Sequence, residues 1–316
     1  MATTMIDIPV VLVLGAGASK PYGFPLGREL VDKAIARSSG LKPILAEIDE
    51  ALANQLDGFL RELRAAHPTS IDAFLEAQYP NYQPVGKAVI AYHLMRKERK
   101  RSLEKVPPEE DWYQHLLYDM LYTDGYDGIG FNQIAILTYN YDRSLEYAIF
   151  KMLHGLGNSD EACRRALQRL YIRHLHGQIG YLPEIDGKGR RYEPTVDAVR
   201  LQLAMDGIRV IHEPVVQNDP IFYEPYIWLR QAKNVIFLGF GYLDKNVAKL
   251  NLQDERMKKA SYWGTGVKVT PKQADFHAEL FPPRPKDSSD QTRITIDTKA
   301  TSVLDYLRNN PHLFRQ

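Results

Sequence analysis

The sequence predicts an α/β protein with a Rossmann-like, mainly parallel sheet, helices on both faces of that sheet, and a helical insertion module. Two observations support this. Short apolar runs alternate with amphipathic helical patterns along most of the chain, as in parallel sheets covered on both faces. One long stretch, 41–122, instead shows helical spacing without strand-like runs. The chain has 316 residues and 44% hydrophobic residues, enough for one large α/β domain that carries an insertion.

Seven strand-like runs define the expected sheet. The first is Val10–Leu14, five apolar residues followed by a Gly-Ala-Gly turn, which is typical of a buried strand. The other expected strands are Ile134–Thr138, Leu170–His174, Ile208–His212, Val235–Gly239, Val267–Thr270 and Arg293–Asp297. Helical patterns lie between them at Ser144–Leu153, Asp160–Leu170, Val196–Met205, Ile221–Ala232, Val247–Met257 and Ser302–Asn309.

The domain organisation follows from the stretch 41–122, which interrupts the alternation of strands and helices. Residues 1–40 and 123–316 are expected to form the Rossmann-like domain, and 41–122 the inserted helical module. The basic run Arg96–Arg101 lies in this module, and we expect it to continue a helix that contains Leu94 and Leu103. A solvated helix face is the simplest interpretation of such a run. Contact with an acidic partner or with nucleic acid is the alternative.

Composition excludes several classes of protein. With 40 basic and 39 acidic residues the formal charge is +1, so nothing global indicates binding to nucleic acid or to a membrane surface. The single cysteine, Cys163, excludes a disulfide framework and a cysteine-based zinc site. No apolar run is long enough to span a membrane, and there is no signal-peptide pattern. We therefore expect a cytoplasmic protein.

Small and polar residues follow four of the predicted strands. These groups are Gly15–Ser19, Thr138–Asp142, His176-Gly177 and Gly239–Asn246. Open α/β sheets place their ligands at the carboxyl ends of the strands. The glycine turn after the first strand lets backbone N–H groups approach a phosphate, which indicates a dinucleotide.

An ordinary dehydrogenase is disfavoured. Lys20 stands where the third glycine of the dinucleotide fingerprint belongs. A second strand that ends in an acidic residue is also missing about 20 residues further on, where it would hold the ribose.

The motifs resemble those of the sirtuin superfamily. The family pattern is G-A-G-x-S, followed after three residues by G-x-P-x-x-R. The residues of this chain that match it are Gly15, Ala16, Gly17, Ser19, Gly23, Pro25 and Arg28. Thr138, Asn140 and Asp142 match T-x-N-x-D, His176-Gly177 matches the catalytic His-Gly, and Gly239 matches the glycine that opens a later loop. The resemblance covers most of 8–40 and 130–310.

Departures from the family pattern narrow the resemblance. Deacylase sirtuins carry a zinc ribbon with four cysteines, and this chain has only one cysteine. Leu26 and Gly27 replace the Asp-Phe of the deacylase loop, and Gly239-Phe240-Gly241 replaces Gly-Thr-Ser. The chain looks more similar to the bacterial sirtuin-like proteins of antiphage defence, which hydrolyse NAD to nicotinamide and ADP-ribose.

The resemblance implies a role for each matching residue. Asn140 and His176 would be the catalytic pair, and NAD the substrate. Gly15, Ala16, Gly17 and Ser19 would surround the diphosphate, and Gly239 would lie near the adenosine half. Pro25, Arg28, Thr138 and Asp142 would complete the NAD site.

The residue types agree with this chemistry. The side chain of Asn140 has a donor and an acceptor, Asp142 can accept from a carboxamide, and His176 has an unperturbed pKa near 6.5. The alternatives are that Asn140 or Asp142 caps the helix that follows, and that His176 is satisfied by backbone groups in a turn. His174 and His176 have the spacing of neighbours on one strand face, but no carboxylate or cysteine partner is evident, so no metal is expected.

The resemblance also implies regulation. An enzyme that empties a cell of NAD must be restrained, so we expect a homo-oligomer or a partner such as a HerA-type ATPase. Two other functions remain open. The chain could bind NAD or ADP-ribose as a regulatory subunit without turnover, or act as an ADP-ribosyltransferase.

Overall fold

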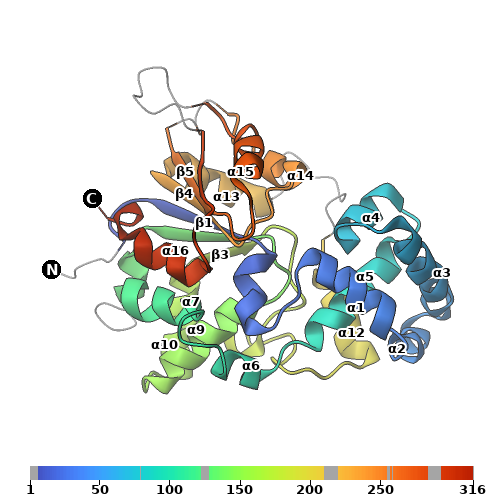
Figure 1. Ribbon diagram of the computed structural model, residues 1–316. Coiled ribbons are helices and arrows are strands. Elements are labelled where there is room, and N and C mark those ends of the chain that lie inside the picture. Colours follow the sequence, from blue (N-terminus) through green and yellow to red (C-terminus); the bar gives the residue numbers. More distant parts are fainter. Residues whose placement is uncertain are drawn as a thin grey trace.

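A six-stranded, wholly parallel sheet forms the centre of the protein (Figure 1). The computed structural model describes residues 6–315 except 79, 122–127, 210–219, 255–256, 258 and 284–292. The strand order is β3-β2-β1-β4-β5-β6, which reverses direction between β1 and β4 as in Rossmann folds. This confirms the predicted α/β class. The strands are β1 (Val10–Leu14), β2 (Ile134–Thr138), β3 (Tyr171–His174), β4 (Asn234–Leu238), β5 (Ser261–Thr265) and β6 (Thr295–Asp297).

The central strand β1 is apolar at every position because both of its faces are buried. It pairs in parallel with β2 and with β4, with Val10 opposite Ile134 on one side and Asn234 on the other. Successive side chains of a strand point to opposite faces. Leu12 accordingly belongs to one hydrophobic core, and Val11 and Val13 belong to the other.

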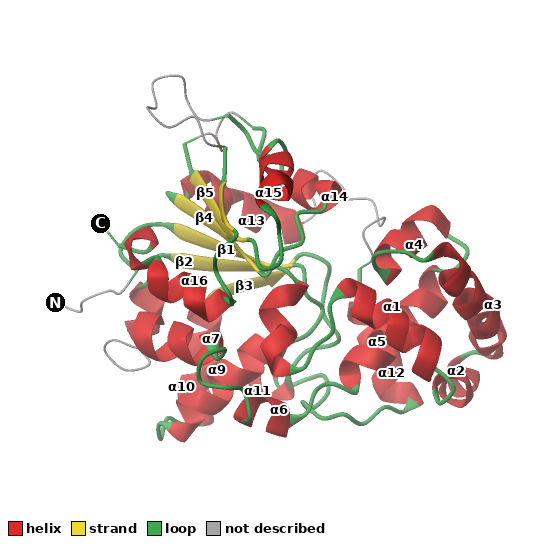
Figure 2. Cartoon of the chain, viewed as in Figure 1, coloured by secondary structure: helices red, strands yellow, loops and turns green. Residues whose placement is uncertain are grey.

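Helices cover both faces of the sheet (Figure 2). The core that contains Leu12 includes residues of α9 (Ser144–Gly155), α10 (Asp160–Arg169) and α16 (Val303–Asn309). The core on the other face includes residues of α13 (Pro220–Gln231) and α14 (Asp244–Lys249), with α15 (Pro271–Ala278) packed at its edge. The remaining short elements are η1 (Ala16–Tyr22), α6 (Lys100–Glu104), η2 (Leu116–Leu121), η3 (Ile129–Phe131), α11 (Pro183–Asp186) and η5 (Pro311–Leu313).

A group of helices lies beside the sheet (Figure 1). It contains α1 (Gly27–Arg37), α2 (Leu41–Ile48), α3 (Glu50–Ala66), α4 (Ile71–Gln78) and α5 (Gln83–Met95). A later helix, α12 (Ala198–Gly207), packs against α5 and α2 in this group. Helix α7 (Trp112–His115) instead contacts α9 and α16 on the sheet.

One of the predicted strands is wrong, and another lies mostly outside the described residues. Val267–Thr270 is a turn in which Lys268 has a φ of 66°, and the strand precedes it as β5. The sequence of β5, Ser-Tyr-Trp-Gly-Thr, lacks the aliphatic run by which the other strands were found. In the expected strand Ile208–His212, Ile208 makes only an isolated antiparallel bridge to Gly177, and 210–212 lie outside the described residues.

Two helix predictions also need correction. The expected helix Val247–Met257 ends early, because α14 stops at Lys249 and Asn251 adopts a φ of 50°. The basic run does not continue one helix, because α5 ends at Met95 and α6 begins at Lys100. Between them Glu98 is 0% exposed, so this part of the run is not a solvated face.

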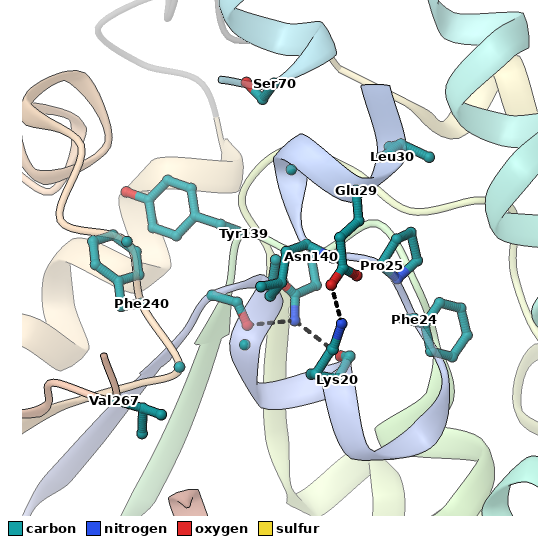
Figure 3. A pocket seen from close by; sticks show the side chains of 18 of the residues that line it. Lys20, Phe24, Pro25, Glu29, Leu30, Ser70, Tyr139, Asn140, Phe240 and Val267 are labelled. Atoms are coloured by element: carbon teal, nitrogen blue, oxygen red, sulfur yellow. Dashed lines mark hydrogen bonds and ion pairs between the residues drawn. The ribbon is translucent and has the colours of Figure 1, made fainter. Parts of the chain in front are cut away.

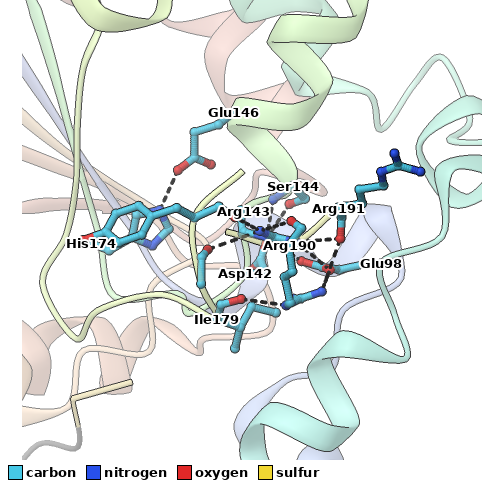
Figure 4. Close-up of polar contacts among 11 residues, drawn as sticks. Glu98, Asp142, Arg143, Ser144, Glu146, His174, Ile179, Arg190 and Arg191 are labelled. Atoms are coloured by element: carbon cyan, nitrogen blue, oxygen red, sulfur yellow. Dashed lines mark hydrogen bonds and ion pairs between the residues drawn. The ribbon is translucent and has the colours of Figure 1, made fainter. Parts of the chain in front are cut away.

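Glu98 is buried because two arginines from the sheet domain surround its carboxylate (Figure 4). Arg143 Nε donates to Glu98 Oε1 at 2.8 Å, and Arg190 Nη1 donates to Oε2 at 2.5 Å. Arg143 also donates to main-chain carbonyls, including that of Arg190 at 2.9 Å. The cluster joins the segment after α5 to the start of α9. Among the described residues, no helix is both long and apolar enough to cross a membrane.

Candidate functional site

A cavity of about 710 Å³ opens along the carboxyl edge of the sheet (Figure 3). Its volume lies within the range of sites for small molecules and cofactors. It is lined by residues that follow β1, β2, β3, β4 and β5, and by Thr69, Ser70 and Asp72 from the helical group. The reversal of strand order between β1 and β4 falls within this lining, at the place where open α/β sheets bind ligands.

Most of the predicted site residues reach this cavity, but two do not. The ones that line it are Gly15, Ala16, Gly17, Ser19, Pro25, Asn140, Asp142, His176 and Gly239. Thr138 lies behind it, where its Oγ1 accepts from the backbone N–H of Asn140 at 3.0 Å. Arg28 is turned away, since it donates to the carbonyl of Pro68 at 3.1 Å and pairs with Asp32 at 3.2 Å.

The loops after β1 and β4 meet through their glycines. The N–H of Gly17 donates to the carbonyl oxygen of Gly239 at 2.9 Å, and that of Gly15 to Leu238 at 3.0 Å. Gly239 has a φ of 58°, and a Cβ on it would lie 2.1 Å from the nitrogen of Ala18. The N–H of Ala18 is also taken, by the carbonyl of Gly15 at 2.9 Å. Two of these N–H groups join the two segments and the third closes a turn within the loop after β1, so none of the three is free to bind a phosphate.

Asn140 is held by its side-chain nitrogen (Figure 3). Nδ2 donates to the carbonyl oxygen of Gly15 at 2.9 Å and to Ser19 Oγ at 3.0 Å. Since a carbonyl oxygen only accepts, the NH₂ group must face Gly15, which determines the orientation of the amide. Both amide hydrogens are then used within the protein. Oδ1 remains as the polar atom that Asn140 offers to a ligand.

Asp142 is buried and accepts hydrogen bonds from Ser144, the first residue of α9. Its Oδ1 accepts from the N–H of Ser144 at 3.1 Å and also from the Ser144 hydroxyl. The Ser144 hydroxyl in turn lies 2.7 Å from the hydroxyl of Tyr113. Burial raises the pKa of Asp142, and hydrogen bonds from Ser144 and Ser19 oppose that rise. Arg143 occupies the N-cap position of α9 and makes no side-chain capping hydrogen bond, so Asp142 does not have the capping role considered from the sequence. Its carboxyl group lines the cavity.

His176 is 4% exposed, and its Nε2 has no hydrogen-bond partner in the part of the chain that the structure describes. The ring of Tyr139 packs edge-on against it, with ring centroids 4.8 Å apart. Burial, together with the positive charge of Lys249, lowers the pKa of His176 to about 3. The unperturbed pKa that suits proton transfer at neutral pH does not apply to this buried ring. His176 is a neutral imidazole.

His174 has the carboxylate partner that the sequence did not reveal (Figure 4). Its Nε2 lies 2.6 Å from Glu146 Oε1, and its Nδ1 lies 2.7 Å from the backbone oxygen of Asn140. Glu146 is in the first turn of α9, so only the packing of that helix brings it to the end of β3. Within the described ranges, no group of three or more His, Cys, Asp or Glu side chains is arranged to hold a metal ion.

The cavity has further charged and aromatic residues that sequence reasoning did not select. Lys20 and Lys268 are two basic residues in its lining, and Lys20 forms an ion pair with Glu29. The aromatic rings of Tyr139 and Phe240 pack edge-on with centroids 5.4 Å apart. Tyr139 and Phe240 lie within segments that the sequence analysis named, but no role was assigned to their rings, and Lys268 lies outside those segments.

No protein-family model matches the sequence, and no curated protein matches it. The geometry of the cavity is therefore the main basis for a functional assignment.

Proposed function

We propose that this protein hydrolyses NAD to nicotinamide and ADP-ribose. One observation carries the proposal: the cavity between β1 and β4 collects Asn140, Asp142 and His176 from the ends of β2 and β3 beside the glycine-joined loops. The resemblance to sirtuin-like proteins assigns Asn140 and His176 to NAD cleavage and Asp142 to NAD binding. The proposal joins that resemblance to the shared location of these residues.

The cavity suits a dinucleotide in size and in chemistry. Its volume of about 710 Å³ leaves room for two bases, two riboses and a diphosphate. The basic residues Lys20 and Lys268 match the negative charge of a diphosphate, and the rings of Tyr139 and Phe240 offer apolar surface to a base. Gly15, Gly17 and Gly239 leave space for a ligand because they have no side chains.

The reaction breaks the bond between ribose C1′ and the nicotinamide nitrogen. The bonding electron pair leaves with that nitrogen and neutralises the pyridinium charge, while the oxygen of a water molecule bonds to C1′ and releases a proton. The transition state has oxocarbenium character, as in glycoside hydrolysis. Because the leaving group is neutral, positioning of the water and the ribose matters more than a strong acid.

Each of three side chains has a part in this scheme. Asn140 Oδ1 accepts a hydrogen bond from the attacking water or a ribose hydroxyl, since Nδ2 is held by Gly15 and Ser19. His176 is a neutral hydrogen-bond partner for a ribose hydroxyl, which would satisfy the buried Nε2. Asp142 accepts from the carboxamide N–H₂ of nicotinamide.

We place this activity in antiphage defence in the cytoplasm, restrained by assembly. The burial of His176 Nε2 supports restraint, because a ligand reaches that atom only after its surroundings rearrange. A homo-oligomer or a second chain such as a HerA-type ATPase is the proposed source of that rearrangement.

Chromatography of the reaction products tests the proposal. The purified protein is incubated with NAD, alone and with candidate partner chains, and nicotinamide and ADP-ribose are quantified. We expect equal amounts of both products, and their loss in Asn140→Ala and His176→Ala. Asn309→Ala and His312→Ala, at exposed positions, are matched controls that keep activity.

Three results would change the assignment. Tight NAD binding without nicotinamide release in any assembly would establish a regulatory binding subunit. Nicotinamide release without equal free ADP-ribose would indicate transfer to another acceptor. Full activity of His176→Ala would remove His176 from the mechanism.

A further inference from the structure

We propose that His174 and Glu146 act as a positioning pair that holds Asn140 in the geometry needed for bond cleavage. This inference rests on the proposed NAD hydrolysis. It adds two residues that do not line the cavity and that no sequence motif selects.

The pair connects three parts of the fold (Figure 4). His174 is the last residue of β3, Glu146 lies in the first turn of α9, and Asn140 follows β2. The two ring nitrogens of His174 make contacts of 2.7 Å and 2.6 Å, to the Asn140 oxygen and to the Glu146 carboxylate. The side chains of His174 and Glu146 are 8% and 13% exposed, so water competes little for these hydrogen bonds.

The acceptor atoms determine where the protons lie. A backbone carbonyl only accepts, so Nδ1 of His174 must carry a hydrogen and donate it to Asn140. Nε2 faces a carboxylate, and the contact is favourable when Nε2 also carries a hydrogen. Burial disfavours the charged ring, but the charge and hydrogen bond of Glu146, with contributions from the Asn140 carbonyl and Asp142, raise the pKa of His174.

Asn140 is thereby held at each of its polar groups except Oδ1. Its carbonyl accepts from His174, its N–H donates to Thr138, and its Nδ2 donates to Gly15 and Ser19. The remaining atom, Oδ1, is the one that the proposed reaction uses. His174 acts on it only through the Asn140 main chain.

The two histidines after β2 and β3 have opposite environments. His176 lines the cavity and is neutral, with its pKa lowered to about 3, whereas the pKa of His174 is raised beside Glu146. Separation of two titratable groups in this way is characteristic of sites that assign them different tasks. In this proposal His176 contacts the ligand, and His174 positions Asn140, which also contacts the ligand.

Two substitutions of His174 test the positioning role. His174→Leu removes the donor to Asn140, and we expect kcat to fall roughly 10- to 100-fold, as small misplacements of a reacting group do. KM for NAD should change by no more than about 3-fold, because the uniform binding contacts remain. His174→Asn keeps a donor near the position of Nδ1 and should recover much of kcat. Equal kcat in His174→Leu and wild type, or no recovery in His174→Asn, would overturn the inference.

The pH profile of Glu146→Gln is a second test, which does not depend on how well the His174 variants fold. In the wild type, deprotonation of His174 places the Nε2 lone pair against a carboxylate, so kcat should fall on the alkaline side. The amide of Glu146→Gln can donate to a neutral ring, so this alkaline decline should disappear. A merely structural contact would leave the profile unchanged, and that result would refute the pair. Asp160→Asn, which alters the exposed His154–Asp160 pair, should keep the wild-type profile.

A readout without turnover separates this inference from the proposed function. In ¹⁵N-histidine NMR spectra, His174 should keep both ring protons to higher pH in the wild type than in Glu146→Gln. Identical titration of the two proteins would overturn the pair. Absence of nicotinamide release from the wild type in any assembly, with the NMR difference present, would refute NAD hydrolysis and would leave His174 and Glu146 as the pair that holds Asn140.

Discussion

The backbone N–H of Gly17 donates to the carbonyl oxygen of Gly239 at 2.9 Å, so the loops after β1 and β4 touch main chain to main chain. A Cβ on Gly17 would lie 2.8 Å from the Cα of Gly239. Every other residue type has a Cβ, which would be too close to Gly239 at this position. The contact closes one wall of the cavity at the reversal of strand order.

We predict that Gly239→Ala destabilises the protein by about 2 kcal/mol or more. The φ of 58° costs an L-residue roughly 1–2 kcal/mol, and the new Cβ would lie 2.1 Å from the nitrogen of Ala18. Urea denaturation measures the change. Gly241→Ala in the same loop is the control, since no atom lies within 4 Å of its Cβ, and it should change stability by less than about 0.5 kcal/mol. Equal effects of the two substitutions would show that the loop contact is not required.

Glu98→Gln should be among the most destabilising polar substitutions in this chain. The change leaves the buried guanidinium groups of Arg143 and Arg190 without a counter-charge. Loss of one partner of a buried ion pair costs about 3–5 kcal/mol. Thermal and chemical denaturation should therefore show a large loss.

The matched control for this prediction is Asp57→Asn. It breaks an ion pair with Lys42 in which both side chains are largely exposed. Such a pair contributes less than about 1 kcal/mol. If Glu98→Gln cost no more than this control, the buried cluster would not be what joins the segment after α5 to α9.

The sequence predicted those strands whose burial in the folded protein requires a local run of apolar residues. The strand β1 was predicted because burial on both faces requires the apolar run Val10–Leu14. The strand β5 was missed because its buried residues, Tyr262, Gly264 and Thr265, include no aliphatic side chain. Its pairing with β4 and β6 makes it a strand, and that pairing is not visible locally.

In the candidate site, the sequence likewise identified residues that follow predicted strands and did not identify residues placed by helix packing. Asn140 and His176 were found because each follows a predicted strand, and strand ends meet at one edge of the sheet. Arg28 does not line the cavity, because the side on which a residue of α1 projects depends on how that helix packs. Glu146 was missed because 28 positions separate it from His174, and the docking of α9 alone brings them together.

Tyr22→Phe should destabilise the protein by about 1–3 kcal/mol. The hydroxyl of Tyr22 accepts from the buried N–H of Tyr113 at 2.8 Å and donates to Asp111 at 3.0 Å. Its removal leaves a buried N–H without a partner. Tyr306→Phe is the control, because the buried hydroxyl of Tyr306 has no partner among the described residues. That substitution should leave stability unchanged or higher, and a loss equal to that of Tyr22→Phe would show that ring packing alone determines both effects.

Acid should destabilise the folded state through its buried neutral histidines. Burial lowers the pKa of His176 to about 3 and that of His93 to about 4, below the 6.5 of an unfolded histidine. Between these pKa values the unfolded chain binds more protons than the folded chain. The contribution of the two neutral rings to the free energy of unfolding is therefore fully present above pH 6.5, and it is lost as the pH falls toward the folded pKa values. His176→Gln should reduce the pH dependence of the unfolding free energy between about pH 4 and pH 6 by one proton, or about 1.4 kcal/mol per pH unit. The exposed control His312→Gln should leave that slope unchanged, and an unchanged slope in His176→Gln would mean that this ring is not buried as a neutral group.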